Sequence, residues 1–131
     1  MRWPAGFGGA LLDPGERSNI EDWLSQRATR SEAQTALLWP GVPPGAYCLR
    51  KSSDATAVAV LCVRLENERV GHFRLLRGAS GGVVLIDVPT TGGDRDYADI
   101  FACIADLKRP GRGAEVVGID IAFCVGSDAA V

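Results

Sequence analysis

The amino-acid sequence predicts an α+β fold, in which a central antiparallel sheet forms a meander and is flanked by two α-helices. Three observations support this prediction. A capped amphipathic segment lies in the first third of the chain, apolar runs separated by polar turns follow it, and a second segment with helical spacing comes later. Consecutive strands joined by short turns pair antiparallel, which leaves one helix for each face of their sheet.

The first helix is predicted at residues 30–38. Thr29 and Glu32 have the spacing of a capping box, and alanines and leucines follow at helical intervals until a proline-rich stretch ends the pattern. An earlier spacing of the same kind, from Ser18 to Glu21, predicts a short helical turn. We therefore expect order to begin near residue 18.

The strands are predicted from apolar runs, rich in Val and Leu, that lie between turn-forming residues. The predicted meander has three or four strands, and the runs that supply them are residues 45–50, 57–65, 70–76 and 83–86. The polar turns between them are short enough to join neighbouring antiparallel strands.

The second helix is predicted to continue through residue 107, because Tyr97 and the apolar residues that follow it keep helical spacing. Asp96, at the end of a long polar loop over residues 89–96, is the expected N-cap. Glycine and proline then break the helix, and residues 116–125 are predicted as a last short strand.

The length of 131 residues fits one domain, with an expected lead-in at 1–17, the domain at 18–125 and a C-terminal tail at 126–131. With 47% hydrophobic residues, 23% charged residues and a net charge of −2, the composition is typical of a soluble globular protein. This charge argues against nucleic-acid binding through bulk electrostatics. No apolar run is long enough for a transmembrane helix, so no membrane insertion is expected.

The four cysteines lie far apart inside apolar runs and form no Cys-x-x-Cys pair. This pattern favours buried thiols in a reducing, cytoplasmic compartment over a disulfide framework. The chain has a single histidine, so it lacks a Cys/His zinc pattern. Nothing in the sequence implies a metal, a nucleotide or a flavin, and no cofactor is expected.

Arg50 is the residue that most strongly indicates a binding site. It ends an apolar strand, and strand alternation places it on the same face as Cys48, which is expected to point inward. A guanidinium near a core needs an anion, and the loop over residues 51–56 offers hydroxyl and backbone N–H donors of the kind that hold a phosphate. The alternative is that Arg50 pairs with a carboxylate such as Glu32 or Asp54.

Six short sequence features occur in an order and at a spacing that together indicate a known family. They are Trp23, Arg30-Ser31-Glu32-Ala33, Tyr47-Cys48-Leu49-Arg50-Lys51-Ser52, His72-Phe73, Gly81-Gly82, and Tyr97 with Ile100. In order and spacing they resemble the Src homology 2 (SH2) domain, from Trp23 to about Leu107. The resemblance implies a non-catalytic module of signal transduction that recognises phosphotyrosine peptides.

The resemblance also implies which residues bind the ligand. The phosphotyrosine-binding residues would be Arg50, Arg30, Ser52, Ser53, Thr56, His72 and Arg74. Arg50 would hold the phosphate from the pocket floor, Arg30 would reach the phosphate and pack on the phenol ring, and Arg74 would flank that ring. The serines and the threonine would supply loop donors, and His72 would support the pocket.

Several of these residues have plainer interpretations. His72 is structural in such an interpretation, and Arg30 and Arg74 are solvated surface charges. Lys51 stands where the family commonly has an acidic residue, and the loop over residues 87–96 is longer than usual. By their positions, Phe73 and Leu85 are expected to line a second pocket for an apolar residue downstream of the phosphotyrosine.

Two alternatives to phosphopeptide binding remain at this point. One is a degenerate SH2-like scaffold that packs against other proteins without binding phosphate. The other is a small hydrolase that uses a pair formed by His72 and Cys48 or Cys62, although thiols in apolar runs are expected to be poor nucleophiles. The expected partners are tyrosine-phosphorylated proteins or peptides, and the expected chain is a monomer. An adaptor, a piece of a larger protein and a pathogen effector in the host-cell cytosol all fit the sequence.

Overall fold

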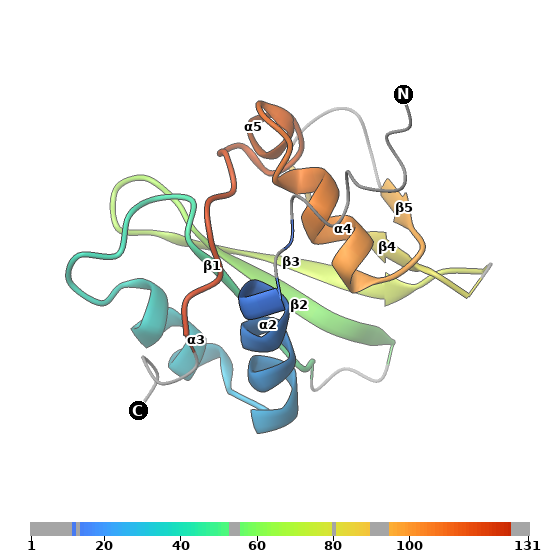
Figure 1. Ribbon diagram of the computed structural model, residues 1–131, viewed down its shortest axis with the longest axis horizontal. Helices are drawn as coiled ribbons and strands as arrows, with labels where there is room; N and C mark the ends of the chain where they lie inside the picture. The colour runs from blue at the N-terminus through green and yellow to red at the C-terminus, as the bar shows by residue number, and fades with distance from the viewer. Residues whose placement is uncertain (1–11, 13, 53–55, 80, 90–94, 127–131) are drawn as a thin grey trace.

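Five antiparallel strands form one sheet in the computed structural model, which describes residues 12, 14–52, 56–79, 81–89 and 95–126 (Figure 1). The strands are β1 (Tyr47–Arg50), β2 (Ala57–Arg64), β3 (Val70–Arg77), β4 (Val83–Leu85) and β5 (Arg95–Tyr97). Each strand pairs with its neighbour in the chain, so the sheet is a meander. The predicted α+β class with a central antiparallel sheet is confirmed, and the architecture is compatible with an SH2-like fold.

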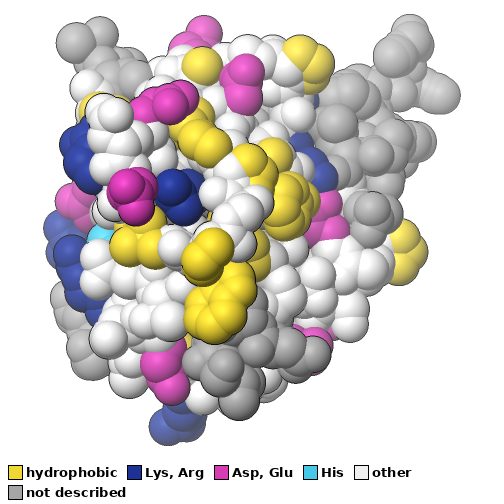
Figure 2. All heavy atoms as spheres, turned by 90° about the vertical axis from the view of Figure 1, so that its left-hand side faces the viewer, with side chains coloured by type: hydrophobic (Ala, Val, Ile, Leu, Met, Phe, Trp, Pro, Cys, Tyr) yellow, Lys and Arg dark blue, Asp and Glu magenta, His cyan; other side chains and the backbone are white. Residues whose placement is uncertain are grey.

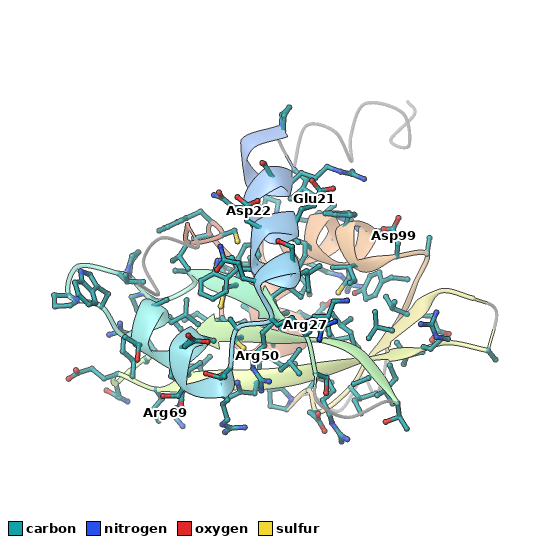
Figure 3. All side chains as sticks on the ribbon, turned by 90° about the horizontal axis from the view of Figure 1, so that it is seen from below. Glu21, Asp22, Arg27, Arg50, Arg69 and Asp99 are labelled. Carbon is teal, nitrogen blue, oxygen red and sulfur yellow. The ribbon has the colours of Figure 1, made fainter. Side chains whose placement is uncertain are left out.

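Helices cover both faces of this sheet. They are α2 (Pro14–Gln26), α3 (Arg30–Leu37), α4 (Ile100–Leu107) and α5 (Arg112–Val117). Tyr47 on β1 donates a hydrogen bond to Glu16 of α2, whereas Arg64 on β2 donates to the carbonyl of Leu37 at the end of α3. Tyr47 pairs with Val63, the neighbour of Arg64, so the two side chains leave opposite faces of the sheet. Helices α2 and α4 therefore share one face, as Figure 3 also shows, and α3 lies on the other.

The core lies between these layers. Trp23, Leu37, Leu49, Leu61 and Ile104 are fully buried and belong to one apolar cluster. The Trp23 indole Nε1–H donates to the carbonyl of Val125 at 2.8 Å, which satisfies a polar group that would otherwise be costly to bury. None of the described helices is long and apolar enough to cross a membrane.

The capping box predicted for α3 is present. Thr29 N donates to Glu32 Oε1 at 2.8 Å, and Glu32 N donates to Thr29 Oγ1 at 3.1 Å. Two orphan donors at the helix start are thereby satisfied by side chains within the first turn. This local arrangement fixes the start of α3 at Arg30, which is the predicted boundary.

Helix α2 begins at Pro14, before the predicted start at Ser18. Proline is well suited to a first helical turn, because its missing N–H has no intrahelical acceptor there. The Ser18–Glu21 spacing lies inside the helix and does not cap it. Glu16, Ile20 and Trp23 follow one another at helical intervals and form the buried stripe of α2.

The second half of the chain departs from the prediction in two places. Strand β5 lies at the end of the predicted loop, and Asp96 is therefore part of a strand and does not cap the helix. The N-cap of α4 is Asp99, whose Oδ1 accepts a hydrogen bond from Ala102 N at 2.8 Å. A three-residue strand has a weak local signal, because its stability comes from pairing with β4.

The predicted strand over residues 116–125 is also wrong in its first part. Residues 112–117 form α5, bracketed by Gly111 and Gly118 in the left-handed conformation that glycine adopts without strain. Only the last part is extended, where Tyr47 N donates to Phe123 O at 3.0 Å and Val125 N donates to Tyr47 O at 2.9 Å. This segment lies parallel to β1 and covers the edge of the sheet.

Candidate phosphate-binding site

A hollow of about 690 Å³ lies where β1 ends and α3 begins. Its described lining residues are Arg27, Ala28, Thr29, Arg30, Arg50, Lys51 and Ser52. Four of these residues carry a positive charge and none carries a negative charge, so we call this hollow the cationic hollow. Figure 2 shows Lys and Arg side chains gathered along one edge of the molecule, beside the histidine side chain.

Arg50 forms part of the wall from the sheet side. It is the last residue of β1 and pairs with Val60 of β2, on the face that α3 covers. Its Nε is buried and has no hydrogen-bond partner among the described residues, and no salt bridge to Arg50 occurs there. Glu32, one of the two carboxylates considered as a partner, instead completes the capping box; Asp54 lies outside the described residues. An unpaired guanidinium with a buried donor is a group that requires an anion.

Arg27 and Arg30 also line the cationic hollow, at the connection from α2 to α3. Arg27 follows the last residue of α2 and has a left-handed backbone with φ of 56°, and Arg30 is the first residue of α3. Both side chains are exposed. Throughout the described ranges, neither makes a hydrogen bond or an ion pair. The positive end of the α3 dipole adds to the attraction for an anion at this position.

The predicted loop donors are only partly placed. Ser52 is half-buried and lines the hollow. Thr56 is exposed and is not among the described lining residues, and Ser53 lies outside the part of the chain that the structure describes. Ser52 is therefore the predicted hydroxyl that the structure brings to Arg50.

His72 lies in the row of side chains next to Arg50. It pairs with Cys62, which pairs with Cys48, and this row spans β3, β2 and β1. The Nδ1 of His72 is 3.4 Å from the Cys62 Sγ, and its Nε2 is buried without a hydrogen-bond partner among the described residues. Among those residues His72 does not line the hollow, and its role in supporting the pocket stays a prediction.

The Cys–His pair considered for a hydrolase is thus close in space, but it is closed to a substrate. Cys48 and Cys62 are both fully buried. The pKa of Cys48 is raised by its hydrogen bond with Cys62 and by burial. The pKa of Cys62 is lowered by hydrogen bonds with Cys48 and His72, against the effect of burial. Because no solvent reaches the sulfur, the geometry favours a structural role for this row.

Arg74 lies in the same row as Arg50, two strands away, at roughly 10 Å by the usual spacing of strands. Its Nε donates to Asp87 Oδ2 at 2.8 Å and its Nη2 donates to Asp87 Oδ1 at 3.1 Å. This pair holds the pKa of Asp87 below its usual range, chiefly through the hydrogen bond from the Arg74 side chain. The structure therefore places Arg74 in a bidentate pair beside the hollow, outside its described lining.

Phe73 and Leu85 are core residues. Their exposed fractions are 5% and 0%, and neither lines a described hollow. Val88, after β4, and Ile119, after α5, pack against the same cluster. Within the described residues, Phe73 and Leu85 thus belong to the core, and the second pocket beside them stays a prediction.

Arg27 is the lining residue that the sequence analysis missed, and Lys51 was treated only as a departure from the family pattern. Arg27 belongs to no motif, and its position depends on the turn between two helices. One signal was available: a cation stands directly before the capping box, three residues from Arg30. A cation directly before a capping box lies near the N-terminus of the helix, as does the first residue after the N-cap.

Comparison with known proteins gives one partial similarity. Over 63 residues the chain is 35% identical to Src-like-adapter 2 of Mus musculus, which corresponds to 45% of this chain and 24% of that protein. The chain thus spans about a quarter of the length of this curated relative. No family model matches the chain.

Proposed function

We propose that this chain is a non-catalytic interaction module of the SH2 type, which binds phosphotyrosine peptides in the cationic hollow. The observation that carries the proposal is Arg50, whose guanidinium has a buried donor and no acidic partner among the described residues. The compatible α+β fold and the partial similarity to an adapter protein support it.

The chemistry of the hollow suits a phosphate monoester. A phosphotyrosine carries a charge of about −1.5 to −2 at neutral pH and three strong acceptor oxygens. Arg50 at the end of β1 and Arg30 at the start of α3 both line the hollow, and Ser52 brings a hydroxyl group to it. Charge-assisted hydrogen bonds to such groups are roughly twice as strong as neutral ones, and an unphosphorylated tyrosine cannot make them.

The depth of the site favours phosphotyrosine over phosphoserine. Arg50 is half-buried at the end of β1 and lines the hollow together with residues of the α2–α3 connection. A long, rigid phenol ring carries its phosphate to such a depth, whereas a phosphoserine is too short. Recognition by a cluster of arginines around an extended phosphopeptide is an established mode of peptide binding.

The test is fluorescence polarisation with a labelled phosphotyrosine peptide, its unphosphorylated form and its phosphoserine form. We expect phosphotyrosine-dependent binding that falls about 100-fold or more in Arg50→Ala, because a desolvated charge pair loses one partner. Arg69→Ala is the matched control, since Arg69 lies in the exposed β2–β3 turn and its removal changes the net charge equally.

We expect the control to bind within about twofold of the unaltered protein, because exposed charges far from a site contribute little to affinity. Circular dichroism melting shows that each variant is folded. Folded protein without phosphate-dependent binding would contradict the proposal and indicate the degenerate scaffold instead.

A further inference from the structure

The cationic hollow holds more positive charge than one phosphotyrosine neutralises. Arg27, Arg30, Arg50 and Lys51 give four formal charges, and no acidic residue is among the described lining. A phosphotyrosine supplies about −1.5 to −2. At least half of the positive charge therefore has no counterpart in a ligand with a single phosphate.

The size of the hollow leads to the same conclusion. A water molecule occupies about 30 Å³ in the liquid, so a phosphotyrosine side chain of about 12 heavy atoms fills at most ~360 Å³. The hollow measures about 690 Å³. A phosphotyrosine therefore leaves room for a further side chain of its peptide beside the phosphate.

We propose that the cationic hollow recognises a phosphotyrosine with an acidic residue next to it in the peptide, and that Arg27 binds this second anionic group. This inference rests on the function proposed above. Arg27 and Lys51 are the two of these four residues that no predicted phosphate contact uses, and Arg27 is the one that lies in the α2–α3 connection.

The backbone on both sides of Arg27 is fixed. Gln26 ends α2, Ala28 is buried in the core cluster, and Thr29 is held in the capping box. Arg27 itself adopts a left-handed conformation with φ of 56°, which is unfavourable for a residue with a side chain. The backbone that carries Arg27 is therefore fixed next to the hollow that its side chain lines.

Among the described residues, no carboxylate binds the Arg27 side chain, in contrast to other arginines of this structure. Arg74 is bound to Asp87, and Arg112 is bound to Asp106. Across the described residues, Arg27 makes no hydrogen bond or ion pair. An exposed carboxylate contact is worth up to about fivefold in affinity, which is enough to select among phosphopeptides but too little to bind without the phosphate.

A double-mutant cycle between protein and peptide tests this assignment. The probes are phosphotyrosine peptides that differ only in having Glu or Gln at the two positions on either side of the phosphotyrosine, measured at a fixed ionic strength near 0.15 M. The variant is Arg27→Asn, because asparagine tolerates the left-handed backbone, and Arg27→Gln is the second variant. Arg69→Asn is the matched control of equal charge.

We expect the unaltered protein and Arg69→Asn to bind the Glu peptides about fivefold more tightly than the Gln peptides. We expect this preference to fall below about twofold in both Arg27 variants, while phosphate dependence remains. An equal affinity for the two peptide series, or a Glu preference that persists in both Arg27 variants, would overturn the inference and leave the proposed function intact. Binding that requires neither the phosphate nor Arg50 would overturn both.

Discussion

Two charged sites on opposite faces of the sheet differ in how their charges are paired. On the face of α2 and α4, the buried Glu16 accepts hydrogen bonds from Tyr47 and from Lys108, which joins α2, β1 and the end of α4. On the face of α3, Arg27, Arg30 and Arg50 surround the cationic hollow without a hydrogen bond or an ion pair among the described residues. Charges of the first kind stabilise the fold, whereas charges of the second kind are available for a ligand.

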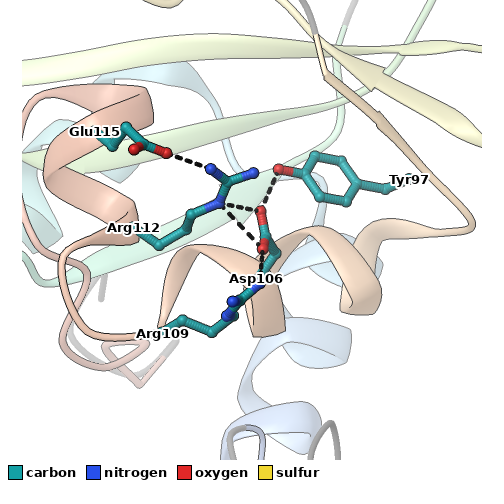
Figure 4. A network of polar contacts seen from close by, with 5 residues as sticks. All are labelled: Tyr97, Asp106, Arg109, Arg112 and Glu115. Atoms are coloured by element: carbon teal, nitrogen blue, oxygen red, sulfur yellow. Dashed lines mark hydrogen bonds and ion pairs between the residues drawn. The ribbon is translucent and has the colours of Figure 1, made fainter. Parts of the chain in front are cut away.

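A second paired cluster lies on the side of α4 and α5 (Figure 4). Asp106 of α4 accepts from Tyr97 Oη at 2.7 Å, from Arg112 Nε at 3.0 Å and from Arg109 Nη1 at 3.2 Å, and Arg112 also pairs with Glu115. The pKa of Tyr97 is raised, first by burial and then by its hydrogen bond to Asp106. This network connects β5, α4 and α5. Its two arginines, Arg109 and Arg112, are both bound to carboxylates.

The largest effect on the free energy of unfolding is expected from removing a paired charge on the face of α2 and α4. Glu16→Ala removes the acceptor of both Tyr47 and Lys108 and leaves a mostly buried ammonium group unpaired. We expect the free energy of unfolding to fall by about 3 kcal/mol in urea denaturation, with unchanged phosphopeptide affinity of the folded protein. Glu21→Ala, at an exposed position of the same helix, is the control and is expected to change it by less than about 0.5 kcal/mol. A similar loss in both variants would show that Glu16 has no special role.

The next test compares two arginines on the α3 face. The Nη1 of Arg64 donates to the carbonyls of Leu37 and Val42, so Arg64→Met is expected to lower the free energy of unfolding by about 2 kcal/mol. Arg50 has no such acceptor among the described residues, so Arg50→Met is expected to raise it by about 1 kcal/mol while phosphopeptide binding is lost. Urea denaturation measures both. Destabilisation by Arg50→Met would mean that Arg50 supports the fold rather than a ligand.

The smallest effect is expected at the exposed pair of Arg74 and Asp87. Asp87→Asn is expected to lower the free energy of unfolding by less than about 0.5 kcal/mol, because solvent screens this pair. The folded-state pKa of Asp87 lies below its usual value of 3.8, so the contribution is present above about pH 4 and is lost as the pH falls through the folded-state pKa. Thermal denaturation from pH 7 to pH 3 measures the difference between the two proteins. A difference that grows toward acid pH would contradict this sign.

The amino-acid sequence by itself determined the parts of the molecule that depend on local chemistry. The capping box of Thr29 and Glu32 acts within one helical turn, and the apolar runs of β1, β2 and β3 are separated by their own turn residues. The exceptional position of Arg50 follows from strand alternation, which needs no knowledge of the rest of the fold. These features account for the fold class, for the start of α3 and for the main residue of the candidate site.

The tertiary structure decided what depends on residues far apart in the chain. Strand β5 exists because β4 pairs with it, and α5 replaces a predicted strand because glycines on both sides allow the turns that bring Val116 into the core. Asp87 binds Arg74 across 13 positions of the sequence, which removes that arginine from the described lining of the hollow. Arg27 reaches the hollow through a turn between two helices, and no local pattern marks such a turn because packing on both sides fixes its conformation.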